Sequence, residues 1–476
     1  MSTAACTSWD EAMRLTVPAA GLAVLLAACA PLAPQPAPDA GLPPRFAGDA
    51  ALAGVGTPAW RDYFSDPALQ AQIEQALAHN RDRALALARL DEARALAGLQ
   101  ASQRAPQIAL DAQGQRGRVP GDLNLTRRPL LGDQFQLGLG LASWELDLWG
   151  RLASLDTAAR QAWLASEAAA QAVTLALVHQ VAQTWLQLAE LDERLRLARR
   201  ALDSREETLR IFRRRVELGA TSRLALTQVQ LLQTQAAALV SQLQQQREAQ
   251  WQALTLLTGG APATGEPRLT ALAPLRAGLP AELLRQRPDL VAAEHQLRAA
   301  DANVQAASAA YLPRISLTAA FGSASAELSG LLKTSSKAWS LTPDLALPLL
   351  DGGRREQALA VQQARRQQAL LAYERAVQGA LRDVNDALSA RQRYAEQLDI
   401  AGQTLAAQGE RARLAQRRYD TGAAAFLEVL DAQRDLLAAE QQQVQARRAL
   451  LASQASLYAA LGGGDLTTPD PQGARP

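Results

Sequence analysis

The chain has 476 residues, with 49 Lys and Arg against 47 Asp and Glu and a formal net charge of +2. This balance argues against a nucleic-acid partner, because binding phosphates requires a dominant basic surface. The sequence has only three histidines and two cysteines, and it lacks the usual nucleophile, phosphate-loop and dinucleotide motifs. We therefore expect no metal site, no other cofactor and no enzyme activity.

The first residues predict export from the cytoplasm. From Met13, the expected true start, a basic residue is followed by an apolar run from Val17 to Leu26 and by small residues before Cys29. The run is too short to span a bilayer as a helix and is typical of a secretory signal. Its end resembles a bacterial lipobox, which implies cleavage before Cys29, acylation of its thiol with palmitate, and sorting to the outer membrane because Ala30 follows. The alternative is an ordinary signal peptide that happens to contain a cysteine.

The rest of the chain consists of two copies of one sequence pattern. Residues 80–114 align with 287–322, and residues 145–152 align with 348–355. Such an internal repeat predicts two halves that fold alike, each reading helix, strand, strand, long helix, turn, long helix. In the first copy, Asp66 and Pro67 predict the N-cap and the first residue of a helix.

The predicted organisation follows from this repeat. The segments are a signal peptide at 1–28, a lipidated Pro-rich tether at 29–58, a first repeat at 59–260, an equatorial crossover at 261–285, a second repeat at 286–464 and a flexible tail at 465–476. Strands are expected at about 106–116, 134–148, 313–322 and 338–350, and long helices at 151–218, 220–258, 354–420 and 423–461.

Apolar and polar residues alternate along the predicted strands. Ile108, Leu110 and Ala112 share one face of the first, and Leu137 and Leu139 share one face of the second. Strands with one apolar face, about 9 to 11 residues long, suit a tilted crossing of a bilayer. Two copies supply only four strands, whereas the smallest membrane barrels close with eight. Several chains would therefore have to share one barrel.

The predicted long helices are too long to lie within a membrane. Residues 152–218 contain neither Gly nor Pro, and at 1.5 Å per residue they form a rod of about 100 Å. A hydrocarbon core is only about 30 Å thick, so these helices are expected in an aqueous space. Apolar residues recur every seven positions in the last helix, which predicts a coiled-coil seam. A free-standing coiled coil would explain the helices but not the strands.

Four stretches carry a resemblance to a known family: WRDYFSDPAL, LLRQRPDL, LPLLDGGR and RRYDTG. With the lipobox, they resemble the TolC superfamily of outer-membrane channels, in its efflux lipoprotein branch typified by OprM and CusC (the NodT branch). The resemblance covers nearly the whole mature chain. It implies a mixed α+β membrane protein, in which a homotrimer forms a twelve-stranded outer-membrane β-barrel. An α-helical periplasmic barrel and an equatorial domain would continue it.

Glycines mark the two helix reversals. Gly219 and Gly422 each follow a long helix, where glycine supplies the backbone angles of a helix C-terminus. The resemblance places both reversals at the periplasmic tip of the channel. The positions after Gly219 include Leu224 and Gln228 but no acid, whereas acids follow Gly422.

The resemblance assigns the periplasmic aperture to the second hairpin. Leu427 and Asp431 match the constriction of the family, with Glu428 beside them, and Tyr419 matches a tyrosine that latches the closed tip. Three ionised copies of Asp431 around an axis would repel one another and attract cations, while three copies of Leu427 would form an apolar ring. Without the resemblance, Asp431 and Glu428 read as solvated acids near a helix start.

The function implied is passive conduction through the exit duct of a tripartite efflux pump. Its partners would be outer-membrane lipids, a periplasmic adaptor of the membrane-fusion class and an inner-membrane transporter of the resistance-nodulation-division class. Adaptor contact would open the aperture and release small molecules outside the cell. The alternatives are a type I secretion channel for polypeptides and a periplasmic coiled-coil lipoprotein without a pore.

Overall fold

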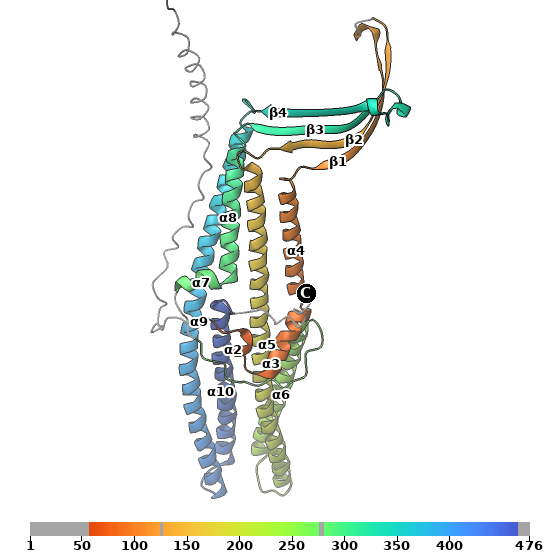
Figure 1. Cartoon of the computed structure of the whole chain (residues 1–476). Coiled ribbons are helices and arrows are strands. Elements are labelled where there is room, and N and C mark those ends of the chain that lie inside the picture. Colours follow the sequence, from red (N-terminus) through yellow and green to blue (C-terminus); the bar gives the residue numbers. More distant parts are fainter. Residues whose placement is uncertain (1–56, 124–126, 276–279, 465–476) are drawn as a thin grey trace, which may run out of the picture. The chain divides into compact units, whose positions relative to one another are not determined.

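The computed structural model describes residues 57–123, 127–275 and 280–464 of the chain, so Cys29 lies outside the described residues. Within them the second half repeats the main elements of the first in the same order (Figure 1). The main elements of the first half are β1 (Ile108–Val119), β2 (Leu130–Glu145), α5 (Arg151–Glu217) and α6 (Arg223–Thr258). Their counterparts are β3 (Arg314–Ser325), β4 (Lys337–Ala346), α9 (Arg354–Asp420) and α10 (Phe426–Ala460). Helices α5 and α9 have 67 residues each.

The described residues form two compact units. The first contains residues 91–123, 127–164 and 294–372, and the second contains 57–90, 165–275, 280–293 and 373–464. All four strands belong to the first unit, and both helix reversals belong to the second. No described helix combines the length and the apolar character needed to cross a membrane.

The sheet of the first unit is antiparallel throughout, in the order β1-β2-β3-β4. Its register places the apolar residues of neighbouring strands opposite one another, because successive side chains of a strand point to opposite faces. One row crosses all four strands through Leu110, Leu139, Phe321 and Trp339. Every member of this row is at least half exposed, from 52% for Leu139 to 76% for Trp339. The described residues therefore build an apolar sheet face that they leave uncovered.

The strand ends differ from the sequence-based expectation. The ladder between β1 and β2 continues to the pair Val119 and Leu130, beyond the expected strands, because backbone pairing persists where the apolar pattern stops. Strand β4 ends at Ala346 rather than near residue 350, since Pro348 has no N–H to donate to a neighbour. A bulge interrupts the pairing of β2 with β3 after Leu141.

Capping residues define the helix starts of the second unit. The carboxylate of Asp66 accepts a 2.9 Å hydrogen bond from the backbone N–H of Ala68, and α3 (Pro67–His79) starts at the next residue, as predicted. Helix α6 begins at Arg223 rather than residue 220, because the hydroxyl of Ser222 caps it. Helix α10 also begins three residues later than expected, at Phe426, but no side chain caps it.

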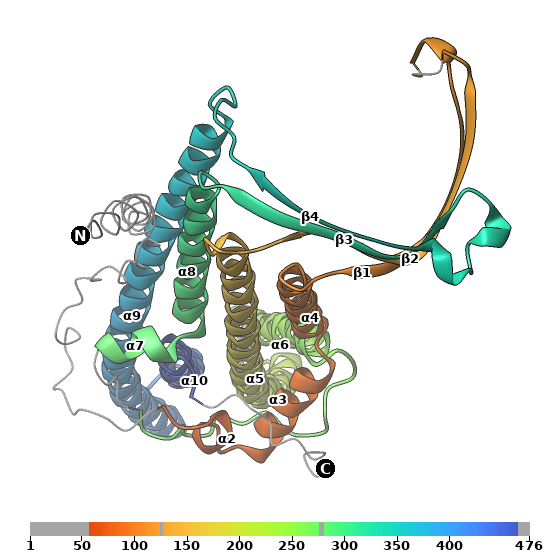
Figure 2. The ribbon, with the colours of Figure 1, turned by 45° about the horizontal axis from the view of Figure 1, so that its top comes forward.

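Aromatic residues dominate the core of the second unit. The rings of Tyr63, in α2 (Trp60–Tyr63), and Tyr458, in α10, stack 4.4 Å apart, and Trp185 of α5 is fully buried beside them. The short helices α2 and α3 thus cover one side of α5 and α10. In Figures 1 and 2, α10 lies between α9 and α5. An ion pair between Arg448 and Glu190 joins α10 to α5.

A buried arginine joins three further helix ends. Arg287 lies between α7 (Pro280–Gln286) and α8 (Pro288–Ala309) and is 8% exposed. Its guanidinium donates to the backbone carbonyl of Ala460 at 3.0 Å and pairs with Asp289 and Asp383 at 2.7 and 3.3 Å. Burial opposes ionisation of this group, but the two carboxylates outweigh it and raise its pKa. The start of α8 is thereby fixed to the end of α10.

Candidate functional site

The two helix reversals of the second unit have the same backbone construction. Gly219 and Gly422 have φ of +68° and +75°, the left-handed region that glycine adopts without strain. After each glycine, the next backbone N–H returns to a carbonyl five residues earlier, from Ala220 to Arg215 and from Ala423 to Arg418, both at 2.8 Å. These bonds satisfy carbonyls at the helix ends and close two tight hairpins. We call α5–α6 the first hairpin and α9–α10 the second hairpin.

An apolar cluster joins the two hairpins near their turns. Leu430 of the second hairpin is buried against Leu209, Phe212 and Val229 of the first. The ring of Phe426 lies 4.6 Å from that of Phe212, between ring centroids. Because Phe426 is the first residue of α10, the start of the second hairpin's return helix is held against the first hairpin.

A polar contact accompanies this cluster. The Arg215 guanidinium donates a 2.6 Å hydrogen bond to the phenol oxygen of Tyr419. The Tyr419 ring also packs 4.8 Å from that of Phe426. The sequence pointed to Tyr419 but not to its partner, since Arg215 is the last of three consecutive arginines and nothing in the sequence distinguishes it.

The three predicted aperture residues lie on the more exposed side of α10. Leu427 is 45% exposed, although it is a large apolar residue at the start of a helix. Glu428 pairs with Arg418 of the same hairpin at 2.8 Å, and Asp431 lies 3.3 Å from Arg434. Leu427 and Asp431 are four residues apart and share a helix face. The structure does not bring them to Tyr419, which belongs to the cluster on the buried side.

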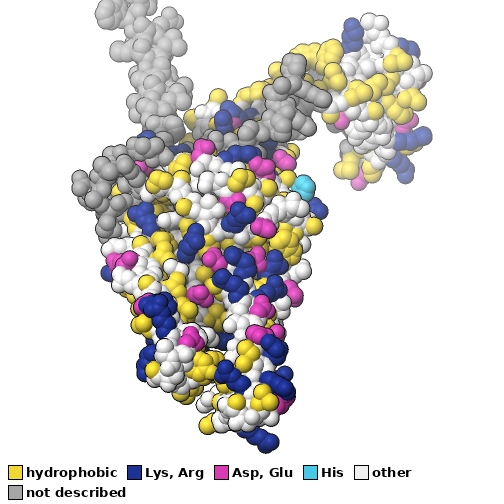
Figure 3. All heavy atoms as spheres, turned by 90° about the horizontal axis from the view of Figure 1, so that it is seen from below, with side chains coloured by type: hydrophobic (Ala, Val, Ile, Leu, Met, Phe, Trp, Pro, Cys, Tyr) yellow, Lys and Arg dark blue, Asp and Glu magenta, His cyan; other side chains and the backbone are white. Residues whose placement is uncertain are grey.

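Charges of both signs surround the reversals. Figure 3 shows basic and acidic side chains interspersed over the face seen from below. A hydrogen bond from Arg411, and to a lesser extent one from Arg434, holds the pKa of Asp435 below its ordinary value. The described residues include no group of three or more His, Cys, Asp or Glu that could hold a metal ion. The contacts near the turns are apolar packing, ring contacts and ion pairs.

Comparison with known proteins identifies the family. The profile of the family described as outer membrane efflux protein matches the chain twice, at residues 72–260 and 279–463. These two matches correspond to the two copies of the repeat. The solvent efflux pump outer membrane protein SrpC of Pseudomonas putida is 37% identical over 422 residues, which cover 88% of this chain and 90% of SrpC. The cation efflux system protein CusC of Escherichia coli is 35% identical, covering 85% of this chain and 88% of CusC.

Solved structures lead to the same conclusion. The open-state structure of the Neisseria gonorrhoeae MtrE outer membrane channel matches with a TM-score of 0.84 at 33% identity, over 92% of this chain and 100% of MtrE. A Pseudomonas aeruginosa membrane protein matches with a TM-score of 0.87 at 36% identity, over 91% of this chain and 98% of that one. The chain therefore belongs to the outer membrane efflux protein family and is a bacterial outer-membrane channel of an efflux pump.

Proposed function

We propose that three copies of the chain assemble into one channel, in which three four-stranded sheets close a twelve-stranded β-barrel and the long helices form a tunnel in the periplasm. The observation that carries this proposal is the exposed apolar row through Leu110, Leu139, Phe321 and Trp339. Such a face suits contact with lipid hydrocarbon. A periplasmic coiled-coil spacer without a pore would not explain an exposed apolar sheet face.

The open edges of the sheet support the assembly. Among the described strands, β1 pairs only with β2 and β4 pairs only with β3. An unpaired strand edge in hydrocarbon leaves backbone groups without hydrogen bonds, at a cost of several kcal/mol for each group. Neighbouring copies would supply the missing partners.

The channel conducts small molecules passively and catalyses no reaction. A pump of the resistance-nodulation-division class in the inner membrane supplies the energy, and a periplasmic adaptor binds the hairpin turns. The adaptor opens the channel only by binding the open form more tightly than the closed form. Relatives named for solvents and cations support a cargo of small molecules rather than polypeptides.

The second hairpin forms the periplasmic aperture, with Leu427 and Asp431 facing the axis and Glu428 beside them. The exposure of the apolar Leu427 at a helix start supports this role, because the described part of its own chain leaves 45% of it exposed. The Arg215–Tyr419 bond and the packing of Phe426 on Phe212 would hold the aperture closed. Cys29 carries the lipid that anchors the chain to the outer membrane.

Removing the aperture side chains tests this proposal. The double substitution Leu427→Ala with Asp431→Ala raises single-channel conductance in planar bilayers, because it widens the constriction and removes its charge. The control is Leu224→Ala with Gln228→Ala, at the equivalent positions after the first reversal, and it leaves conductance unchanged. A double variant that conducts like the wild type would exclude these residues from the aperture.

A further inference from the structure

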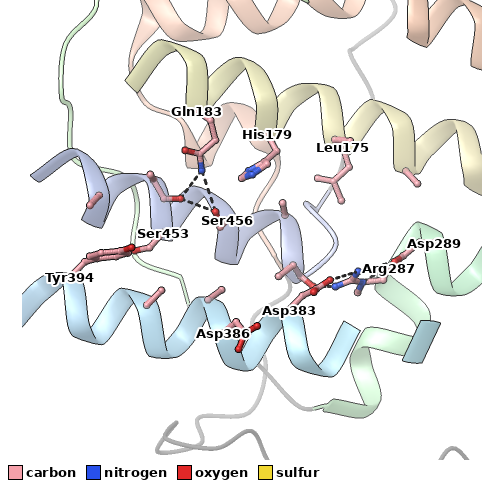
Figure 4. Close-up of a pocket in the computed structure, with 18 of the residues that line it drawn as sticks. Leu175, His179, Gln183, Arg287, Asp289, Asp383, Asp386, Tyr394, Ser453 and Ser456 are labelled. Carbon is pink, nitrogen blue, oxygen red and sulfur yellow. Dashed lines mark hydrogen bonds and ion pairs between the residues drawn. The ribbon is translucent and has the colours of Figure 1, made fainter. Parts of the chain in front are cut away.

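A cavity of about 720 Å³ lies in the second unit between α5, α9, α10 and the start of α8 (Figure 4). Its volume falls in the range of small-molecule sites, about 300–1,000 Å³. Helix α10 presents Ser453 and Ser456 to this cavity, whereas its residue Tyr458 packs against Tyr63 of α2. The cavity therefore lies on a side of α10 that α2 and α3 leave open.

Most charged groups of the cavity wall are neutralised by close partners. Arg287 is matched by Asp289 and Asp383, and Arg448 is matched by the buried Glu190 at 2.8 Å. Asp386 is the exception. Its side chain is 76% exposed, and its one ion-pair contact among the described residues is Arg382 at 4.0 Å.

Arg382 compensates Asp386 only weakly. Its guanidinium lies closer to Asp383, at 3.3 Å, and is itself 73% exposed. A solvent-exposed pair at this separation contributes little. The wall of the cavity therefore presents one carboxylate whose charge no near neighbour neutralises, which favours a cationic ligand.

A second acceptor on the wall has no donor. The imidazole of His179 bonds the backbone of Ala455, while its Nδ1 is buried and has no hydrogen-bond partner among the described residues. Burial lowers the pKa of His179, so the ring is neutral at pH 7. A neutral imidazole that donates from one nitrogen accepts at the other. A buried acceptor without a donor carries an energetic cost that a ligand N–H would remove.

Apart from Gln183, Ser453 and Ser456, the remaining lining is apolar and mostly small. Leu175 of α5 and Tyr394 of α9 face a surface of alanines contributed by three helices, Ala172, Ala176, Ala387, Ala390, Ala449, Ala452, Ala459 and Ala460. Such a surface accommodates an apolar body, because binding there removes hydrocarbon from water. The polar groups stand among these residues and can fix the orientation of a ligand.

We propose that this cavity binds amphipathic organic cations of the protonated-amine class, with the ammonium toward Asp386, an N–H donated to His179 and the apolar body against the alanines. The binding itself depends on one subunit only. Its role, holding cationic cargo in transit, rests on the proposed function. A quaternary ammonium of the same shape keeps the charge but has no N–H, so the site distinguishes the two.

The test uses the purified full-length channel in amphipol and three fluorescent probes. These are dansylcadaverine, its N,N,N-trimethylammonium analogue and its neutral N-acetyl analogue. We expect saturable binding of dansylcadaverine with a blue-shifted emission, about fivefold weaker binding of the trimethyl analogue and no saturable binding of the acetyl analogue.

Four variants locate the site. Asp386→Asn weakens the binding of dansylcadaverine about fivefold. Asp399→Asn, the same change at an exposed position of the same helix, leaves this binding unchanged. His179→Leu abolishes the preference for the primary ammonium over the trimethyl analogue. Ala449→Phe fills the cavity and abolishes saturable binding.

Planar-bilayer conductance, measured on the same preparations, separates the two proposals. A wild-type channel that conducts but shows no saturable dansylcadaverine binding overturns the binding site and leaves the proposed function standing. Equal affinities of the Asp386→Asn and Asp399→Asn variants, or an unchanged probe preference in His179→Leu, would also overturn it. A wild-type protein that forms no conducting channel would instead overturn the proposed function.

Discussion

Arg215 and Tyr419, 204 residues apart in the sequence, are joined by a 2.6 Å hydrogen bond from the guanidinium to the phenol oxygen. The first residue belongs to α5 and the second to α9, so the bond ties one hairpin to the other close to both turns. Phe426 packs against Tyr419 and against Phe212, which adds an apolar contact to the polar one. The second hairpin is therefore held against the first by a hydrogen bond and by ring packing, both near the turns.

Tyr419→Phe is expected to weaken the contact between the two hairpins. The substitution removes the hydrogen bond but keeps the ring that packs on Phe426. A hydrogen bond of this kind contributes about 1 kcal/mol, which corresponds to about a fivefold change in the ratio of open to closed tips. Single-channel recordings should show a larger open fraction for Tyr419→Phe and for Arg215→Ala. Arg210→Ala is the matched control, because Arg210 pairs with Glu207 within its own helix. Identical open fractions in all three variants would show that the bond does not hold the tip.

His179 predicts a loss of stability in mild acid. Burial lowers the pKa of its imidazole, partly offset by a hydrogen bond with the Ala455 backbone. Above an ordinary histidine pKa of about 6.5, neither the folded nor the unfolded chain holds this proton. As the pH falls below that value the unfolded chain binds the proton first, so the free energy of unfolding decreases until the pH has passed the folded pKa.

Guanidinium denaturation of the wild type between pH 7.5 and 5 measures this effect. The midpoint should fall less steeply with pH in His179→Gln, which cannot take up the proton. His79→Gln, at an exposed position at the end of α3, should follow the wild type. If all three curves fell in parallel, the acid sensitivity would have another source.

Cys29 is expected to carry the lipid. Palmitate labelling in a Gram-negative host should mark the wild-type protein but not Cys29→Ser, since acylation requires the thiol. Cys6→Ser is the control, because Cys6 precedes the expected start at Met13. Label retained in Cys29→Ser, or lost in Cys6→Ser, would contradict the lipobox assignment.

The periodicity of the sequence predicted the local elements well, for identifiable reasons. Each copy has alternating strand residues and a helix of 67 residues without Pro, and both patterns depend only on neighbours in the chain. The Asp66–Pro67 start of α3 was predicted because a cap acts over two or three residues. The predicted starts of α6 and α10, at residues 220 and 423, are each three residues too early, since the sequence does not show how many residues a turn uses.

Contacts between distant segments of the chain could not be predicted from the sequence. Nothing in the sequence near Arg215 shows that this residue, and not one of the two arginines before it, bonds Tyr419. Arg287 reaches the carbonyl of Ala460, 173 residues away, and that contact fixes one end of the cavity between α5, α9 and α10. Such features depend on which helix ends meet, whereas a hydrophobic pattern gives only the face that is buried.

Gly219 and Gly462 allow backbone strain to be separated from crowding. Both have positive φ, +68° and +97°. A Cβ on Gly219 would meet nothing within 4 Å, whereas a Cβ on Gly462 would lie 2.6 Å from the carbonyl oxygen of Gln286. Gly219→Ala is therefore expected to cost only the left-handed strain, about 1–2 kcal/mol. Gly462→Ala should cost about 1–3 kcal/mol more, because backbone must move to relieve the contact.

Asparagine provides the control, because it tolerates left-handed backbone better than alanine but still carries a Cβ. Gly219→Asn should recover most of the stability lost in Gly219→Ala, whereas Gly462→Asn should recover little. Hydrogen exchange checks the location: protection at the C-terminal end of α10 should fall in both Gly462 variants and stay unchanged in the Gly219 variants. Equal losses in Gly219→Ala and Gly462→Ala would mean that α10 ends without close contact to Gln286.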